Sequence, residues 1–284
     1  MSGTAAKART TQQRLQGAAR QGGTAHARRV IQVIEAFTRL AGPDHGPTEI
    51  AAATGLHPTV VYRIVQSGLH TTLFVRGPAG RYRLGPGAAQ IGMHALAAAA
   101  PAPGATRPVL DRLSSTMNGL ALLWVLSALG PGRVIADAAG RFGVDALGLS
   151  AGDFVQLGRT LRTGASGRAI AAYLPPHMID AVAAEPLPHP AGSAPRDPKA
   201  FRSALQDIRQ AGYAVAREEM PGWSEVAAPV MWGGVIVGAV SVLVPAPFLA
   251  KDLTVPVAAT MAAATRVTRL MSHGTQTAAP PRGG

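Results

Sequence analysis

The sequence of 284 residues contains no cysteine, only three lysines and few aromatic residues. The lack of cysteine excludes disulfide bonds, thiolate metal sites and cysteine nucleophiles. A secretory signal is also missing, because residues 1–29 are small, polar and basic and contain no apolar run. These absences favour a cytoplasmic protein, and one associated with the nucleoid if it binds DNA.

Catalytic and metal-binding patterns are equally scarce. The eight histidines are scattered without HExxH or His-x-His spacing, so they do not indicate a zinc site. GASG at 164–167 lacks the GxSxG spacing of a nucleophile elbow, and no GK(S/T) phosphate loop is present. Glu218 and Glu219 are neighbours on an expected strand, where successive side chains point to opposite faces. We therefore expect no metal, no cofactor and no catalytic site, which leaves a small-molecule enzyme as the weakest alternative.

Residues 226–250 form a run of 25 residues without charge, which is long enough to cross a bilayer. Prolines and glycines interrupt this run, and Gly233 and Gly234 separate two segments rich in β-branched residues. The pattern predicts a buried β-hairpin, with a membrane span as the alternative.

Basic residues are concentrated in the N-terminal third of the chain. Residues 1–87 hold eleven Lys or Arg against three Asp or Glu, whereas the remaining residues hold sixteen against twelve. Such an excess at one end indicates a polyanionic partner, whose counterions are released on binding.

Within this basic third, residues 46–85 have the pattern of two helices around a tight turn, followed by a hairpin. A first helix is expected over 48–54, capped by Thr48, and Gly55 supplies the left-handed turn. The second helix is expected to begin near Pro58, since proline is well tolerated at the first helical position. This order of elements predicts a winged helix-turn-helix, which places one helix in the DNA major groove.

The expected second helix has an inner and an outer face. Val61, Ile64 and Val65 recur at helical spacing and predict the buried stripe. The hairpin after the helix, with strands over 73–76 and 81–84, would carry arginines beside phosphates. The residues that we expect to face DNA are Arg28, Arg29, Thr48, His57, Thr59, Val60, Tyr62, Arg63, Gln66, Arg76, Arg81, Tyr82 and Arg83.

The pattern along the chain predicts an α+β protein. A mixed sheet with helices packed on it is expected in the C-terminal part, where helical and strand patterns alternate. The expected parts are a disordered basic arm (1–26), a winged helix-turn-helix (27–86), a linker helix (87–103), an α/β domain (104–272) and a disordered tail (273–284).

Two groups of motifs are similar to one family. The first group is TEIAAATGLHPTVVYRIV at 48–65, followed by GRYRLGPG at 80–87. The second is TGASGRAIAAYLP at 163–175, followed by IRQAGYAVAREEMPGWSEVAAPVMWGGVIVGAVSVLVP at 208–245. In this order and spacing, the chain resembles the IclR-type bacterial transcription regulators. The resemblance implies a DNA-binding winged helix, a linker helix, a GAF-like effector domain, and a homodimer or dimer of dimers on an inverted-repeat operator.

The resemblance also implies a small-molecule effector cavity. Because Trp223 is aromatic and Glu225 is acidic, we expect a largely apolar effector that is neutral or donates hydrogen bonds. Two alternatives remain beside the enzyme: an architectural DNA-binding protein without a ligand, and a regulator-like protein that binds a ligand but not DNA. The residues implied to line the cavity are Ala165, Ser166, Trp223, Glu225, Ser241 and Leu243.

Overall fold

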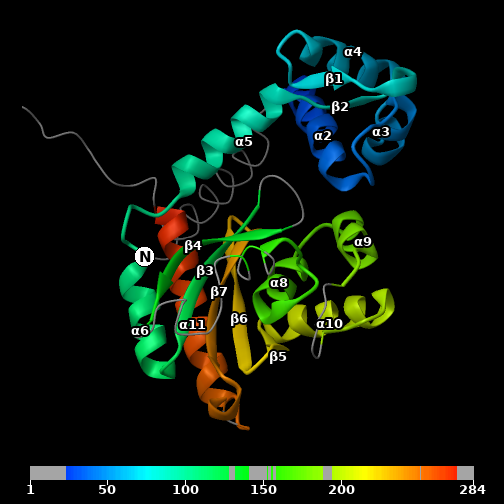
Figure 1. Cartoon of the computed structure of the whole chain (residues 1–284). Helices are drawn as coiled ribbons and strands as arrows, with labels where there is room; N and C mark the ends of the chain where they lie inside the picture. The colour runs from blue at the N-terminus through cyan, green and yellow to red at the C-terminus, as the bar shows by residue number, and fades with distance from the viewer. Residues whose placement is uncertain are drawn as a thin grey trace, which may run out of the picture. The chain divides into compact units, whose positions relative to one another are not determined.

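The computed structural model describes residues 24–127, 132–140, 152, 155, 158–187, 194–249 and 251–273. Its contacts divide the chain into two compact units, Met1–Ile91 and Gly92–Gly284, which are described separately below (Figure 1). Most of the predicted arm, and nearly all of the predicted tail, lie outside the described residues.

The N-terminal unit is a small helical domain with a two-stranded antiparallel hairpin. Its hydrophobic core combines all three helices with one residue from each strand. In chain order its elements are α2 (Ala25–Arg39), α3 (Pro47–Thr54), α4 (Pro58–Leu69), β1 (Phe74–Arg76), the 3₁₀ turn η1 (Pro78–Gly80) and β2 (Tyr82–Leu84). The predicted order of a helix pair and a hairpin is therefore confirmed.

Local backbone chemistry sets the turn between α3 and α4. Gly55 adopts the left-handed conformation at φ 71°, and its N–H donates to the Ala51 carbonyl at 2.8 Å. The expectation that Thr48 caps α3 is wrong: the helix begins one residue earlier, because Pro47 with its fixed φ occupies the first helical position and Gly46 is the cap.

Helix α5 (Pro86–Ala99) contains the boundary between the two units. It carries no charged residue, and three of its large apolar side chains are exposed to solvent. The exposed fractions are 64% for Ile91, 63% for Met93 and 48% for Leu96. Met93 and Leu96 are neighbours on the helix surface, whereas Ile91 lies on another side, so α5 exposes apolar side chains around much of its circumference.

The C-terminal unit contains a five-stranded sheet in the order β4-β3-β7-β6-β5. Every pair of neighbouring strands is antiparallel, so the expected mixed sheet is wrong. Three of the four pairs, β3–β4, β5–β6 and β6–β7, join strands that follow each other in the chain, and the fourth pair, β3–β7, is also antiparallel. The elements are α6 (Arg107–Met117), β3 (Leu120–Leu126), β4 (Arg133–Ala139), α8 (Gly164–Ala171), α9 (Pro176–Ala184), α10 (Pro198–Ala211), β5 (Ala214–Met220), β6 (Trp223–Trp232), β7 (Val235–Pro245), the 3₁₀ turn η3 (Ala246–Phe248) and α11 (Thr254–His273).

Both faces of this sheet are covered by helices (Figure 1). Residues such as Leu123 and Val242 point to the face that α6 and α11 cover, whereas Leu122 and Leu243 point to the face of α8, α9 and α10. Because neither face meets water, β7 is buried almost throughout, which accounts for the long uncharged run. That run forms strands β6 and β7, and among the described residues no helix is long and apolar enough to span a membrane.

Candidate nucleic-acid interface and ligand cavity

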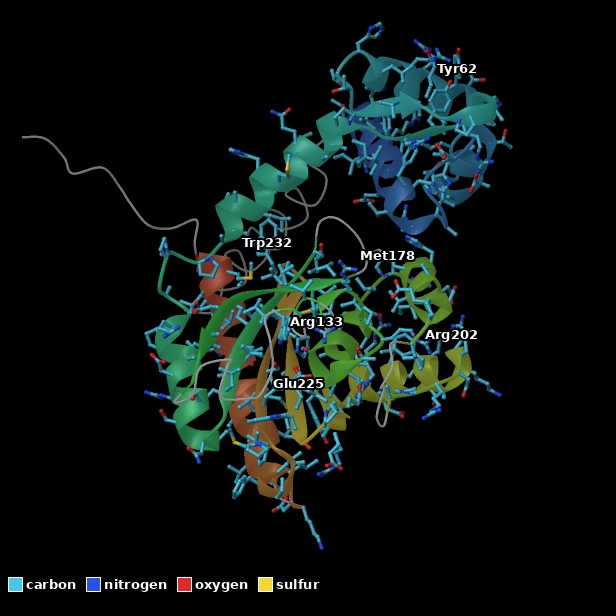
Figure 2. All side chains as sticks on the ribbon, viewed as in Figure 1. Tyr62, Arg133, Met178, Arg202, Glu225 and Trp232 are labelled. Carbon is cyan, nitrogen blue, oxygen red and sulfur yellow. The ribbon has the colours of Figure 1, made fainter. Side chains whose placement is uncertain are left out.

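Helix α4 presents a polar face to solvent. Val61, Ile64 and Val65 are buried, as predicted, while Thr59 and Arg63 are exposed on the outer side. Tyr62, which Figure 2 labels, is 48% exposed despite its aromatic ring. The helix itself is capped by the His57 ring, whose Nδ1 accepts a hydrogen bond from the Thr59 N–H at 3.3 Å.

One side of this face borders a groove of about 500 Å³ between α2, α4 and β1. Arg29 from α2 and Arg63 from α4 both line it, so two guanidinium groups from different helices share one concave surface. Arg28 and Thr48 are also exposed, and Val60 is half-buried at the edge of the groove. The remaining lining residues are His26, Val30, Ile64, Ser67, Gly68, Leu73 and Phe74.

The other side of the face borders the hairpin, and Gln66 connects the two. Its side-chain amide donates to the Tyr82 hydroxyl at 2.9 Å, and its carbonyl oxygen accepts from Arg76 at 3.3 Å. Tyr82, which we expected to face DNA, is only 3% exposed and belongs to the core. That expectation is wrong because the Tyr82 ring packs inward and its hydroxyl is used within the domain.

A second set of contacts fixes the hairpin to α3. Arg81 donates to Glu49 at 2.6 Å and to the Asp44 carbonyl at 2.9 Å, and Arg83 pairs with the Asp44 carboxylate at 2.9 Å. Both arginines were expected to contact phosphates. That expectation stays a prediction: their guanidinium groups hold the hairpin in place, while each side chain stays nearly half-exposed.

Glu49 also binds the buried ring of His45, whose Nδ1 lies 3.0 Å from the carboxylate. The other ring nitrogen lies 2.9 Å from the carbonyl oxygen of Gly42. Desolvation on its own raises the pKa of Glu49, but the hydrogen bond and charge of His45 together with Arg81 hold this pKa below its ordinary value. The carboxylate is therefore the charged centre that joins α3 to the hairpin.

The C-terminal unit holds a different kind of charged site, at the start of α8. The Gly164 N–H donates to Glu219 at 2.8 Å, and the Ser166 N–H donates to Glu225 at 3.2 Å. Ala165 and Ser166 lie within the first turn of α8 and are fully buried. Two carboxylates thus accept from the N-terminal N–H groups of α8, where the helix dipole favours negative charge.

Glu219 reaches this position through an irregularity in edge strand β5. The pairing with β6 shifts register between Arg217 and Met220, and Glu218 has a positive φ of 50°. As a result Glu218 points outward and Glu219 inward, where Arg168 binds it with two contacts of 2.7 and 2.9 Å. Both partners of this ion pair are at least nine-tenths buried.

Arg133 on β4 is a second buried arginine, 2% exposed. It donates to the Thr160 carbonyl at 2.5 Å, and its guanidinium lies 4.9 Å from the centre of the Trp124 ring. Burial lowers the pKa of Arg133 to about 10, against the attraction of Glu225, which raises it. The side chain therefore keeps its positive charge at neutral pH.

These groups surround a cavity of about 20 Å³, room for about one water molecule. Of the predicted lining residues, Trp223, Glu225 and Leu243 line it, whereas Ala165, Ser166 and Ser241 do not. Figure 2 marks Arg133 and Glu225 on the side of the sheet that α8 covers. The complete lining is Trp124, Arg133, Gly164, Ala216, Glu219, Met220, Trp223, Glu225 and Leu243.

The acidic Glu225, on which the expected choice of effector rested, is not the only charged group of the cavity. Arg133 lines the cavity beside Glu225, and Arg168 neutralises Glu219, so the formal charges balance. Ser241 has a supporting position instead, since its hydroxyl accepts a hydrogen bond from the Trp124 indole N–H at 3.0 Å.

One feature of the sequence relates to the position of Arg133, namely the two glycines at 164 and 167. A Cβ atom at position 164 would lie 2.8 Å from Nη2 of Arg133, and one at position 167 would lie 2.5 Å from its Nη1. Glycines 164 and 167 therefore make the space that the guanidinium occupies. Their spacing of one helical turn predicts the close approach of some group but does not identify which group approaches.

Two family models match the chain. The model described as the IclR helix-turn-helix domain matches residues 27–67, and the model described as the bacterial transcriptional regulator IclR C-terminal matches residues 156–269. The first match covers the helices of the N-terminal unit, and the second covers α8 to most of α11. A comparison with curated proteins gave no match.

Solved structures with the same fold are similar over nearly the whole chain. A structure assigned as an IclR transcriptional regulator from Silicibacter sp. TM1040 has 23% identity and a TM-score of 0.52, covering 89% of this chain and 97% of that chain. An IclR homolog from Microbacterium hydrocarbonoxydans, complexed with 4-hydroxybenzoate, has 21% identity and a TM-score of 0.50, covering 87% and 99%. An IclR-type regulator from Alicyclobacillus acidocaldarius has 22% identity and a TM-score of 0.50, covering 88% and 100%.

Proposed function

Because the chain belongs to the IclR family of bacterial transcriptional regulators, we propose that it binds specific DNA through its N-terminal unit and that a small molecule in its C-terminal unit controls this binding. The observation that carries the DNA-binding part is the exposed face of α4, which has arginines along both edges. A helix in the major groove needs such positive flanks, because phosphates line both sides of the groove.

Within this proposal, side chains on α4 contact base edges and those on the flanks contact phosphates. Arg63 lies on the outer face of α4 and can donate two parallel hydrogen bonds to guanine. Arg29 lines the groove on one edge of the face and Arg76 bonds Gln66 on the other, which supports phosphate contacts for both. Gln66 acts by holding Arg76 and the hairpin against α4, because both ends of its amide are already engaged.

We further propose that the chain binds DNA as a homodimer through α5. A second copy of this chain is the occupant that we propose for the exposed apolar side chains Ile91, Met93 and Leu96, because the helix holds no Lys, Arg, Asp or Glu to specify a charged partner. A two-fold dimer presents two copies of α4 and therefore matches an inverted-repeat operator.

The cavity beside α8 is the proposed effector site. It brings aromatic and aliphatic walls together with a few buried polar groups, which is the usual composition of a ligand pocket. The homolog that binds 4-hydroxybenzoate supports a small aromatic molecule as the kind of effector that this fold accepts.

One observation favours a second candidate, a DNA-binding protein without an effector. The cavity has room for about one water molecule, and the protein's own carboxylates already accept from the α8 N–H groups. In that case the operator affinity would not respond to any small molecule.

Selection of bound duplexes from a random DNA pool tests the proposed function. We expect the purified full chain to enrich an inverted repeat, and Arg63→Ala to lose most of that enrichment. Arg202→Ala is the matched control, because Arg202 is an exposed arginine of the C-terminal unit that pairs with Asp180. Failure of the wild-type chain to enrich any sequence would contradict the proposal.

A further inference from the structure

The charges in the cavity beside α8 carry information about its ligand. A helix N-terminus usually attracts an anionic ligand through its N–H groups. Here Glu219 and Glu225 accept from the N–H groups of Gly164 and Ser166, so the protein supplies these anions itself. A ligand with only a negative charge would meet two carboxylates at this end of α8.

Arg133 and Glu225 nevertheless retain unused hydrogen-bonding capacity. Nε of Arg133 and Oε1 of Glu225 are buried and have no hydrogen-bond partner, although both side chains line the cavity. One is a donor on a cation and the other is an acceptor on an anion. Buried polar groups without a hydrogen-bond partner destabilise the folded protein. A ligand that forms hydrogen bonds with both groups therefore gains binding free energy.

The space between these two side chains lies over Gly164. A Cβ atom at this position would lie 2.8 Å from Nη2 of Arg133 and 2.9 Å from Oε2 of Glu225. The two charged groups do not form an ion pair with each other, although both belong to the described residues. Because Gly164 has no side chain, a cation and an anion both approach the backbone at the start of α8, where they line the same cavity.

We propose that the ligand is a zwitterion of the α-amino-acid type with an aromatic or large apolar side chain. This inference rests on the effector site proposed above. The ligand carboxylate pairs with Arg133 and its ammonium group with Glu225. The apolar side chain packs against the cavity wall formed by Trp124, Trp223 and Leu243.

The closed cavity is too small for such a ligand, so part of its wall must move when the ligand binds. Met220 and Trp223 are the half-buried wall residues, and they flank the turn between β5 and β6. This turn follows the register shift of β5, where the pairing with β6 is already interrupted. Entry of the ligand at this turn leaves Arg133 and the start of α8 in place.

Three probes of matched shape separate the possible charge preferences. L-Phenylalanine carries both charges, 3-phenylpropionate lacks the ammonium group, and 2-phenylethylamine lacks the carboxylate. Calorimetry on the full chain is expected to give the tightest binding for L-phenylalanine, by about tenfold or more over each of the others, because each of those loses one charge-assisted contact.

Single substitutions then identify the group that reads each charge. Glu225→Gln is expected to abolish the preference for L-phenylalanine over 3-phenylpropionate, and Arg133→Gln to abolish the preference over 2-phenylethylamine. Arg202→Gln, on the surface of α10, is the control and keeps both preferences. If circular dichroism shows that Arg133→Gln does not fold, the proposal is tested by Glu225→Gln alone, because this substitution removes a charge with little change in shape.

The outcomes separate this inference from the proposed function. Tighter binding of 3-phenylpropionate than of L-phenylalanine to the wild-type chain would overturn the zwitterion while leaving an effector site intact. Binding of none of the three probes would also overturn it. DNA selection with the same preparation shows independently whether the regulatory function stands, since that experiment requires no ligand.

Discussion

Two groups of arginines, one in each unit, occupy opposite environments. In the N-terminal unit Arg29, Arg63 and Arg76 are exposed, whereas in the C-terminal unit Arg133 and Arg168 are 2% and 4% exposed. Exposed arginines contribute little to folding and stay accessible to a polyanion. Buried arginines require compensating carboxylates, and these same carboxylates give the cavity its chemistry. One residue type is thus accessible for the proposed DNA contacts in one unit and takes part in building the cavity in the other.

The largest expected effect is on the buried ion pair. Replacing Arg168 by methionine leaves Glu219 charged and buried without its partner, so we expect a loss of about 3–5 kcal/mol in the free energy of unfolding. Urea unfolding followed by tryptophan fluorescence measures this loss, because all three tryptophans lie in the C-terminal unit. Arg202→Met at the exposed pair with Asp180 is the control, expected at about 0–1 kcal/mol. Equal losses of unfolding free energy in the two variants would contradict the difference that we expect between a buried and an exposed arginine.

The next largest effect is expected on dimerisation through the exposed apolar side chains of α5. Ile91→Asp is expected to weaken the dimer by about 1.5–3 kcal/mol, because a buried isoleucine contributes this much to association. Sedimentation equilibrium of the full chain gives the dimer dissociation constant. Gln90→Asp on the same helix adds the same charge at a polar position and should change the dimer dissociation constant less. A wild-type chain that sediments as a monomer would show that α5 contacts something else.

DNA binding should distinguish three arginines of the N-terminal unit. Arg63→Ala is expected to weaken specific binding by about 1–3 kcal/mol and Arg29→Ala to lower the salt slope by about 0.9. Arg81→Ala is expected to change the slope less, because Glu49 and Asp44 already hold this guanidinium. Fluorescence anisotropy with the selected duplex over a salt series measures all three. A full unit of slope lost in Arg81→Ala would mean that this side chain contacts phosphate after all.

The smallest expected effect is on acid stability. The pKa of Glu49 is lower in the folded protein than its ordinary value of 4.5. The charged carboxylate therefore stabilises the folded N-terminal unit at pH values above 4.5, and this stabilisation is lost as the pH falls below 4.5. Glu49→Gln should therefore make the protection of α3 and β2 against hydrogen exchange less dependent on pH in this range. Glu35→Gln, at an exposed site on α2, serves as the control. An unchanged pH dependence in Glu49→Gln would assign the acid sensitivity to another group.

The sequence predicted most of the fold but only part of the sites. Helical spacing in α4 and the glycine at position 55 depend on local rules, so their structure could be predicted from neighbouring residues. Arg133 and Glu219 could not be found in this way. They reach the cavity through the pairing of distant strands and through the register shift in β5, which decides whether Glu218 or Glu219 points inward. Tyr82 was misplaced because its ring packs into a core that residues distant in the sequence build, and its hydroxyl accepts a hydrogen bond from Gln66.

We propose that a ligand bound among the buried charges of the C-terminal unit changes the affinity with which the exposed arginines of the N-terminal unit bind DNA. The affinity of the full chain for its selected operator tests this claim, measured with and without the small-molecule fraction of a bacterial extract. We expect that fraction to change the wild-type affinity by about 5–150-fold, the usual range of coupling between two sites, and to leave the Arg133→Gln affinity unchanged. An operator affinity that stays constant in the wild type, or that shifts equally in both proteins, would contradict the claim.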